Sequence, residues 1–547
     1  MSVVLGVNAV FHDPAAALIV DGVTVAAAEE ERFTRRKHGK APVAFSTWEL
    51  PQHAIDFCLA FGEIDPSDID AVGYSYDPAL APPRTGDVTA DGWEELRTLY
   101  VERAELFLRS QLAGLRAGVV QHVPHHVAHA ASAWGPSPFD SCAVMVLDGR
   151  GERGSYLAGV ASDNRFVPLA SQELPHSLGL RYEELTAHLG FRRSSDEYKV
   201  MALASYGRPV HLDAFRQLIR TDGRGGFTTA PVDWARFAPP AAGDERVVTE
   251  HADLASSVQV RLEEVMLELA EWLHGETDQR NLAMAGGVAL NCVANSRLYE
   301  AGPFDDVWVQ PAAGDAGTAL GAAVHVSAML GDEPKPMQTA ALGPGWSDAQ
   351  IEQALVAAKV PFRRSESIAD DVADALARDE IVAWFQGRSE FGPRALGHRS
   401  LFANPGVAAN LDRLNAVKGR ERFRPVAPMV LAERAAELFE GGPIPSPFML
   451  FVHRVREPWQ DRIPAVVHVD GTARIQTVDQ ASEPLVHRMI SAFERATGVP
   501  VVVNTSLNTA SRPMVDDPRD ALECFGSSPI DLLASGPFAV RRAEWNA

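Results

Sequence analysis

The sequence predicts an α/β protein with two large domains. Its 547 residues are too many for one hydrophobic core, because cores rarely grow beyond about 300 residues. A strand-turn-strand pattern occurs twice in the first half of the chain. In the second half, three apolar runs each lead into polar or basic residues, as the strands of an open α/β sheet do.

The first half begins with a strand and a hairpin. Residues 3–10 are apolar and 11–14 form a polar turn, and the apolar runs 16–20 and 23–28 are joined by Asp21-Gly22. The pattern returns as an apolar run at 141–147, a glycine-rich turn at 148–154 and an apolar run at 156–161. We therefore predict an internal duplication of strand, polar turn and strand.

The second of these turns, DGRGERG, has Gly149, Gly151 and Gly154 in the spacing of a dinucleotide-binding loop. In a Rossmann fold that loop opens a helix, whose N-terminus then binds the pyrophosphate. Here it opens the alternating run 156–161, which predicts a strand. A glycine-rich hairpin whose backbone N–H groups face a phosphate is the favoured interpretation.

A helix and another glycine turn follow. Apolar residues step by four and three along 258–272, which predicts an amphipathic helix that ends at His274-Gly275. A strand at 282–284 then leads into the pair Gly286-Gly287. Paired glycines allow either close approach of a helix N-terminus to a ligand or tight packing of strand against helix, and the sequence leaves both open.

Proline- and glycine-rich segments mark insertions and a domain boundary. The stretches 76–92 and 222–244 exceed ordinary loop length, so each is predicted to be a lid or a surface loop. The stretch 331–345 has the composition of a linker, and we place the domains at 1–340 and 341–547. Beyond the linker we predict strands at 381–385, 466–469 and 501–503.

Composition narrows the class of protein. No window approaches the eighteen or so apolar residues of a membrane span, and the N-terminus lacks signal-peptide features, so we expect a cytoplasmic protein without a membrane partner. The net charge of −22 disfavours nucleic acid. The four cysteines form no CxxC pair, which predicts buried thiols instead of disulfides or a thiolate zinc site.

Three histidines stand close together in HHVAH. On a helix, His125 and His129 share one face and His126 is expected to point elsewhere. The metalloprotease motif HExxH fails, because His126 replaces its glutamate. With Asp148 and Asp315, which lie in small-residue turns, the pair could bind iron, manganese or zinc. An ordinary histidine-rich helix end is the alternative.

Basic residues gather in the turns of the second half. Arginine binds phosphate oxygens with two parallel hydrogen bonds, so this clustering predicts a site for a phosphorylated ligand, with an ion-paired surface as the alternative. No GxxxxGK[ST] loop is present. The residues concerned are Arg388, Arg394, Arg399, Lys418, Arg424 and Arg474.

The first half of the chain contains six distinctive motifs: VLGVNAVFHDPAAALIVDG at 4–22, EEERFTRRKH at 29–38, HHVAHA at 125–130, VLDGRGE at 146–152, EYKVMALASYG at 197–207 and GGVALNCVAN at 286–295. This set resembles the bacterial O-carbamoyltransferases of antibiotic biosynthesis, a family that includes the nodulation protein NodU. The resemblance covers nearly the whole chain. It implies a duplicated N-terminal domain of the actin and sugar-kinase type, related to tRNA threonylcarbamoyl transferases, and a YrdC-like C-terminal α/β domain.

The resemblance also implies site residues. A divalent metal, Fe²⁺ first with Mn²⁺ or Zn²⁺ as alternatives, would be held by His125, His129, Asp148 and Asp315, and His12 and Lys37 would be catalytic. Nucleotide would bind in the first domain at Gly149, Gly151, Lys199, Gly286, Gly287 and Asn291. Carbamoyl phosphate and Mg²⁺-ATP would bind in the second at Arg394, Lys418, Arg424, Thr472, Arg474, Asn504 and Ser506.

The implied reaction forms carbamoyl-AMP from carbamoyl phosphate and ATP, and then transfers the carbamoyl group to a hydroxyl of a natural product. The acceptor could be a macrolide, an ansamycin or an aminoglycoside, and the negative charge mildly favours the cationic aminoglycoside. The oligomeric state is open, with a homodimer as one expectation.

Two other functions remain as alternatives. One is a sugar-kinase-like enzyme that phosphorylates a polyol, although NAVFHDP stands where such a kinase carries an Asp-x-Gly-Thr-like turn. The other is a non-catalytic nucleotide-binding switch. For His12 itself, the alternative to a catalytic role is a turn residue that bonds its own backbone.

Overall fold

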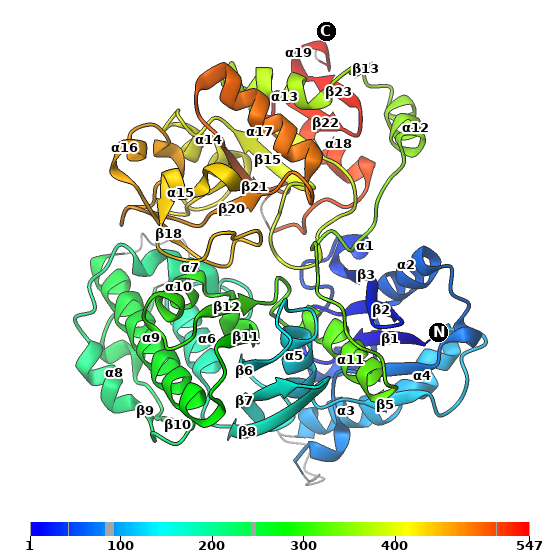
Figure 1. Ribbon diagram of the computed structural model, residues 1–547, viewed down its shortest axis with the longest axis vertical. Coiled ribbons are helices and arrows are strands. Elements are labelled where there is room, and N and C mark those ends of the chain that lie inside the picture. The colour runs from blue at the N-terminus through cyan, green and yellow to red at the C-terminus, as the bar shows by residue number, and fades with distance from the viewer. Residues whose placement is uncertain (1, 42, 83–91, 242–247, 510, 546–547) are drawn as a thin grey trace. The chain divides into compact units, whose positions relative to one another are not determined.

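The computed structural model describes residues 2–41, 43–82, 92–241, 248–509 and 511–545 (Figure 1). The chain forms two compact units, Met1–Met337 and Gln338–Ala547, which divide within the stretch 331–345. In the described ranges, no helix combines the length and the apolar character that a bilayer span requires.

The first unit contains two five-stranded sheets with the same topology. In each sheet three consecutive antiparallel strands are extended by two parallel strands from further along the chain. The first sheet has the order β3 (Val23–Glu29), β2 (Ala15–Val20), β1 (Val3–Asn8), β4 (Ala71–Tyr74), β5 (Val120–His122). The second has the order β8 (Arg165–Glu173), β7 (Gly154–Ser162), β6 (Cys142–Leu147), β11 (Asn281–Ala285), β12 (Asp306–Val309). The predicted duplication is confirmed.

Two helices lie between these sheets and cross from one half to the other (Figure 1). Helix α5 (His125–Trp134) follows the first sheet but packs on the second, and α11 (Ala316–Met329) follows the second sheet but packs on the first. The helices also pack on each other so closely that a Cβ on Gly321 would lie 1.7 Å from the carbonyl oxygen of Ala128. Only glycine permits that approach.

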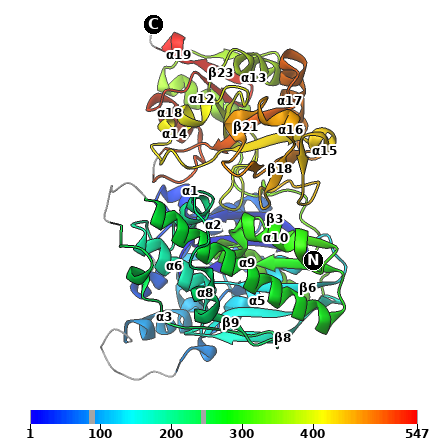
Figure 2. The same cartoon turned by 90° about the vertical axis from the view of Figure 1, so that its left-hand side faces the viewer.

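Other helices cover the outer faces of the two sheets. Helix α2 (Gln52–Gly62) packs on β2 and β3, and α9 (Thr249–Thr277) lies beside α8 (Leu212–Leu218), as Figure 2 shows. The predicted end of this long helix at His274-Gly275 is wrong, because the chain turns only at Asp278, in a left-handed conformation (φ 51°). The remaining helices are α1 (Glu31–Thr34), α3 (Gly92–Glu102), α4 (Ala104–Gln111), α6 (Leu178–His188), α7 (Glu197–Ala204) and α10 (Cys292–Ala301).

The two predicted insertions contain local structure. Part of 76–92 forms a short 3₁₀ turn at Pro78–Leu80, and its residues 83–91 lie outside the described ranges. Part of 222–244 forms a hairpin of β9 (Ile219–Thr221) with β10 (Phe227–Thr229), and its residues 242–244 lie outside the described ranges.

The second unit is built on an eight-stranded mixed sheet. Its order is β13 (Arg363–Arg364), β23 (Phe538–Arg541), β22 (Leu532–Ser535), β14 (Val382–Phe385), β15 (Arg399–Ala403), β21 (Val501–Ser506), β16 (Ala427–Leu431), β20 (Gln476–Val478). A small sheet adds β17 (Phe439–Glu440), β18 (His453–Val455) and β19 (Thr472–Ala473). The strands predicted at 381–385 and 501–503 are confirmed as β14 and β21.

The strand predicted at 466–469 is wrong. Pro464–Val466 forms a 3₁₀ turn, and strand pairing starts only after Asp470 and Gly471, where β19 pairs with β18. Val466 is buried and Val469 is exposed, and a short apolar run in a loop has the same sequence pattern as a strand, so periodicity alone could not separate the two.

Helices cover both faces of the large sheet, so its strands are buried on both sides. Along β14, Val382 and Trp384 face one apolar cluster with helices α13 and α17, while Ala383 and Phe385 face the other with α12 and α18. The helices of this unit are α12 (Asp348–Ala358), α13 (Ile368–Ala377), α14 (Asn410–Val417), α15 (Ala435–Leu438), α16 (Glu457–Gln460), α17 (Pro484–Thr497), α18 (Pro518–Gly526) and α19 (Arg542–Trp545). The four cysteines of the chain are free and buried, as predicted.

Candidate active site

The duplication brings four chain segments of the first unit to one place. His12 follows β1 and Asp148 follows β6, the corresponding strand of the second sheet. His125 begins α5, and Asp315 directly precedes α11, the corresponding helix. Residues up to 303 positions apart in the sequence therefore meet where the two halves face each other.

The predicted metal ligands form one cluster. Ligand atoms of His125, His129, Asp148 and Asp315 all lie within 4.8 Å of one another, and all four residues are buried. Nε2 of His125 is 3.4 Å from Oδ2 of Asp148 and 3.7 Å from Oδ1 of Asp315. Nε2 of His129 is 3.8 Å from the same two oxygens.

The imidazole nitrogens of the cluster are arranged as metal ligands are. Nδ1 of His125 donates to the carbonyl oxygen of Ser75 (3.3 Å), which leaves the lone pair of Nε2 directed at the carboxylates. Nε2 of His125 and Nε2 of His129 are buried and have no hydrogen-bond partner among the described residues. Two imidazoles and two carboxylates therefore fit a divalent metal with nitrogen and oxygen ligands.

His126 differs from the prediction. It was expected to point away from the pair, but its Nε2 lies 3.6 Å from Oδ2 of Asp148 and is also buried without a hydrogen-bond partner in the described ranges. Its ring stacks on that of His129, with centroids 6.3 Å apart. His126 lies in the first turn of the helix, which faces the loop carrying Asp148, so helical spacing alone could not place it.

The two carboxylates favour a proton on His125, whereas burial disfavours one on His129. Burial lowers the pKa of His125, but Asp148 and Asp315 more than offset this and raise it to about 9. Burial lowers the pKa of His129, and the positive charge of His125 adds to that effect. The histidines hold the pKa of Asp148 well below its usual range despite burial. A divalent cation would replace this proton.

A buried polar chain connects the parts of the site. Asn8 donates through Nδ2 to the carbonyl oxygens of His12 (3.1 Å) and Asp13 (3.0 Å). Ser75 donates to Oδ1 of Asn8 (3.2 Å), and Thr318 donates to Oγ of Ser75 (3.0 Å). This chain ties the turn after β1 to β4 and to the first turn of α11.

The predicted base His12 lies beside the cluster. Its Nε2 is 3.8 Å from Oδ2 of Asp315, and its Nδ1 is 2.9 Å from Oδ2 of Asp13. Burial lowers the pKa of His12, but Asp315 and Asp13 outweigh it and raise the pKa to about 10. A cation bound by Asp148 and Asp315 would weaken the first of these attractions and so lower the pKa of His12.

The predicted catalytic residue Lys37 forms an ion pair with Glu31, with Nζ 3.1 and 3.0 Å from the two carboxylate oxygens. Burial lowers the pKa of Lys37, but Glu31 and Asp13 outweigh it and raise the pKa. Lys37 is thus a permanent cation and can donate hydrogen bonds but not accept a proton.

The predicted phosphate-binding glycines have different surroundings. The N–H of Gly151 donates to the carbonyl oxygen of Gly154 (2.8 Å), so the hairpin itself uses it. Gly286 has φ 94°, and a Cβ there would lie 2.2 Å from the carbonyl oxygen of Leu147. Of the two alternatives for this glycine, the contact corresponds to tight packing within the protein. The N–H of Gly287 donates to Oδ1 of Asp148 (3.0 Å) and so orients a metal ligand. A Cβ added to Gly149 would lie 3.2 Å from Oε1 of Glu183.

Two further predicted nucleotide residues have local partners. Asn291 caps helix α10 by accepting from the N–H of Ala294 (3.1 Å), and its Nδ2 donates to Gln259 (2.8 Å). Lys199 pairs with Asp196, its Nζ lying 3.1 Å from Oδ2.

In the second unit, the side chains of Lys418 and Ser506, two of the predicted site residues, contact each other. Nζ of Lys418 donates to Oγ of Ser506 (2.8 Å) and to Oδ1 of Asn508 (2.5 Å). The Lys418 side chain is buried, and its ammonium group also donates to the carbonyl oxygen of Ser506. Asn508 was not predicted, although it stands in the motif NTSLN that follows β21.

Asn504 and Gln476 hold the loop that carries Arg394. Nδ2 of Asn504 donates to the carbonyl oxygen of Ala395 (2.9 Å) and to Oε1 of Gln476 (2.9 Å). Nε2 of Gln476 donates to the carbonyl oxygen of Leu396 (2.8 Å). Asn504 is 1% exposed, so it contributes by shaping this loop.

The other predicted residues of this unit lie nearby or serve the fold. Thr472 donates to Asp470 (2.7 Å) and contacts Nδ1 of His468 (3.1 Å), and Arg474 acts electrostatically on that histidine. Arg424 lies 3.6 Å from Glu421. Arg399 is fully buried, binds backbone carbonyl oxygens and stacks on Phe385, so it fixes the loop and offers no free phosphate contact.

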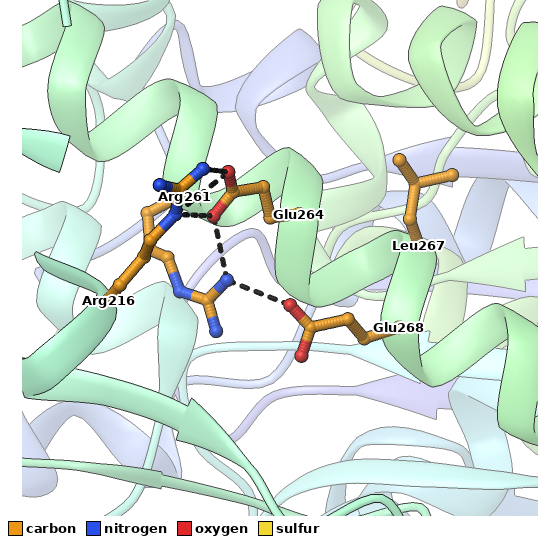
Figure 3. A pocket seen from close by; sticks show the side chains of 5 residues that line it. All are labelled: Arg216, Arg261, Glu264, Leu267 and Glu268. Atoms are coloured by element: carbon orange, nitrogen blue, oxygen red, sulfur yellow. Dashed lines mark hydrogen bonds and ion pairs between the residues drawn. The ribbon is translucent and has the colours of Figure 1, made fainter. Parts of the chain in front are cut away.

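A hollow of about 500 Å³ lies elsewhere on the first unit, along α8 and α9 (Figure 3). Arg216 and Arg261 reach Glu264 from two sides, and Nη1 of Arg261 also lies 2.9 Å from Glu268. The described residues that line it include none of the predicted site residues. We interpret it as an ion-paired helix contact.

Together, the duplicated α/β unit and its buried histidine-aspartate cluster define the class as an α/β enzyme with a candidate metal centre. Residues 3–80 and 96–324 match the family model described as the carbamoyltransferase N-terminus, and residues 373–542 match the carbamoyltransferase C-terminus. The chain belongs to the carbamoyltransferase family and is a carbamoyltransferase enzyme.

Curated relatives agree with this assignment. Nodulation protein NolNO of Sinorhizobium fredii is 38% identical over 98% of this chain and 80% of its own length. Nodulation protein U of Bradyrhizobium diazoefficiens is 31% identical over 94% of this chain and 93% of its own length. An uncharacterized protein of Synechocystis sp. is 36% identical over 99% of this chain and 97% of its own length.

Among solved structures, HypF of T. kodakarensis is 17% identical and covers 60% of this chain and 48% of its own, with a TM-score of 0.34. That score is below the level at which two chains share an overall fold.

Proposed function

We propose that this carbamoyltransferase works in two steps. The second unit forms carbamoyl-AMP from carbamoyl phosphate and Mg²⁺-ATP, and the first unit transfers the carbamoyl group to a hydroxyl of a natural product. The observation that carries the proposal is the placement of His12 directly beside the buried cluster of His125, His129, Asp148 and Asp315. That arrangement puts a proton acceptor next to a site suited to a phosphate-binding cation.

In the transfer step, Nε2 of His12 takes the proton of the acceptor hydroxyl. The hydroxyl oxygen forms a bond to the carbamoyl carbon, and the bond from that carbon to the phosphate oxygen of AMP breaks. Lys37, held as a cation by Glu31, donates hydrogen bonds to the developing negative charge. When bound, the divalent metal would neutralise charge on the departing phosphate.

In the activation step, water cleaves carbamoyl phosphate to carbamate and phosphate. A carbamate oxygen then forms a bond to the α-phosphorus of ATP, and the bond to pyrophosphate breaks, which gives carbamoyl-AMP. This mixed anhydride is needed because carbamate itself is a poor electrophile in water. Lys418 with Ser506 and Asn508, and the loop of Arg394 held by Asn504, support a phosphate-binding role. Arg424, Thr472 and Arg474 complete the proposed set.

The resemblance of the motifs supports finer assignments. These are a sugar-kinase-like first unit, a YrdC-like second unit, iron as the metal, and a homodimer. Among family members, the motifs resemble those of the tobramycin carbamoyltransferase, and with the net charge of −22 this favours an aminoglycoside over a macrolide or an ansamycin.

The test measures the two steps separately. His125→Ala should keep the formation of carbamoyl-AMP and lose transfer, while Arg424→Ala should lose formation and still accept purified carbamoyl-AMP. Arg216→Ala, in the exposed ion pair of α8, is the matched control and should change neither step. Equal loss of both steps in His125→Ala would contradict the assignment of the two steps to two units.

The mass of the product separates carbamoyl transfer from the kinase alternative. A product heavier than the acceptor by about 80 mass units, instead of about 43, would show phosphoryl transfer.

A further inference from the structure

A hydrogen-bonded chain of four side chains leads away from His12. Oδ2 of Asp13 lies 2.9 Å from Nδ1 of His12, and Oδ1 of Asp13 lies 2.9 Å from Nδ1 of His38. On its other side, Nε2 of His38 lies 2.8 Å from Oγ of Ser195. The four residues come from three separate segments: the turn after β1, the segment after α1 and the segment before α7.

The chemistry of the carboxylate decides the tautomers of both rings. An ionised aspartate only accepts hydrogen bonds, so the Nδ1 atoms of His12 and His38 both carry protons. Although burial raises the pKa of Asp13, His38 and His12 hold it well below its usual range. The Nε2 atom of His12 is therefore the one that can accept a proton, and it is the atom that faces the metal cluster.

The backbone around this chain adopts an unusual conformation. Asp13 (φ 48°), His38 (φ 63°) and Ser194 (φ 56°) all lie in the left-handed region that favours glycine. Such a conformation persists where surrounding contacts enforce it. Here Asn8 binds the carbonyl oxygen of Asp13, and Glu31 accepts from the N–H of His38 (2.8 Å).

We propose that Asp13 is a positioning residue for His12, and that His38 and Ser195 in turn hold Asp13. This inference rests on the proposed base role of His12. Asp13 fixes the proton of His12 on Nδ1 and the ring in one orientation, so that Nε2 meets the acceptor hydroxyl. Ser195 links the segment before α7 to this arrangement through its hydrogen bond with His38.

The key variant is Asp13→Asn. An asparagine has the same shape, but its one carbonyl oxygen can accept from only one of the two rings, and its amide must donate to the other. One histidine is therefore forced into the wrong tautomer or loses its partner. We expect kcat for transfer to fall by roughly 10²- to 10⁴-fold, as for the orienting carboxylate of a catalytic triad, with KM for the acceptor changed less than about threefold.

The decisive measurement is a double-mutant cycle. If Asp13 acts through His12, Asp13→Asn should change transfer by less than about twofold in a His12→Ala background, because the group that it orients is gone. An equal loss in both backgrounds would show a merely structural role and overturn the proposal. Carbamoyl-AMP formation and the thermal midpoint serve as folding controls.

A second pair of variants covers failure of Asp13→Asn to fold. Ser195→Ala should lower kcat for transfer by about 3- to 10-fold, the effect of losing one outer hydrogen bond, and Ser195→Thr, which keeps the hydroxyl, should restore most of it. Wild-type kcat in Ser195→Ala would overturn the role of Ser195. Failure of the proposed function differs from all these outcomes, because His12→Ala alone would then leave transfer unchanged.

Discussion

The three histidines of α5 differ in what they contact, and a metal measurement should separate them. His125 and His129 each face both carboxylates of the cluster, whereas His126 approaches only Asp148. We expect His125→Ala and His129→Ala to weaken binding of the divalent metal at least about 100-fold, because each removes a ligand.

His126→Ala is the matched comparison at the same helix end. We expect it to keep the metal, with affinity reduced by less than about 10-fold, as for a residue that orients a ligand. Metal content after purification and competition with a chelator measure both effects. Stoichiometric metal in His129→Ala would contradict the ligand assignment.

A buried histidine of the second unit should make stability depend on pH. His453 is 1% exposed and donates through Nε2 to the carbonyl oxygen of Pro443 (2.9 Å), and burial lowers its pKa to about 4. The unfolded chain, with a pKa of about 6.5, binds the proton first as pH falls, so stability is present above that value and is lost towards pH 4. The expected loss between pH 7 and pH 5 is about 2 kcal/mol.

His453→Gln tests this, because glutamine keeps a donor for Pro443 but cannot titrate. The variant should lose that part of the pH dependence of the free energy of unfolding, measured in urea. His53→Gln is the control, since the side chain of His53 is 62% exposed. An unchanged slope in His453→Gln would show that other groups cause it.

At the scale of elements, the turn between β11 and α10 connects the sheet to the candidate metal site. A Cβ at Gly286 would lie 2.2 Å from the carbonyl oxygen of Leu147, and the next residue binds Asp148. We expect Gly286→Ala to destabilise the protein by more than about 2 kcal/mol and to weaken metal binding.

Gly275→Ala is the opposite case. Gly275 lies in the last turns of α9, is exposed, and a Cβ there would meet nothing within 4 Å. This variant should raise the free energy of unfolding by about 0.5–1 kcal/mol, because alanine restricts the unfolded chain and favours the helix. Equal effects of the two variants would contradict the close approach at Gly286.

Helices and strands with a strong apolar period could be predicted from the sequence. Segments whose conformation depends on tertiary packing could not. The hairpins of the first unit and strands β14 and β21 follow from alternating apolar runs and turn residues. The strand predicted at 466–469 failed because only Val466 of this run is buried, while Val469 is 60% exposed. The predicted end of α9 was wrong because one glycine destabilises a helix by only about 1 kcal/mol, and burial of one face of α9 outweighs that cost.

At the scale of the molecule, the proposed two-step reaction requires carbamoyl-AMP to pass from the second unit to the first. Retention of carbamoyl-AMP on the chain would protect it from water. In that case one variant cannot pass the intermediate to the other, and a mixture of His125→Ala and Arg424→Ala should recover less than about 5% of wild-type product. The measurement is product formation from carbamoyl phosphate, ATP and acceptor. Efficient complementation in the mixture would show that the intermediate is released.

The sequence by itself determined the α/β class, the duplication, and the residue types and motifs of the family. Those depend on local pattern: apolar period, turn residues and short motifs. The tertiary structure decided which of these residues act together. Only the crossing of α5 and α11 brings Asp315 to His125, and only the fold places His38 on Asp13 and Ser195 on His38. Such contacts join segments far apart in the chain, and no local period encodes them.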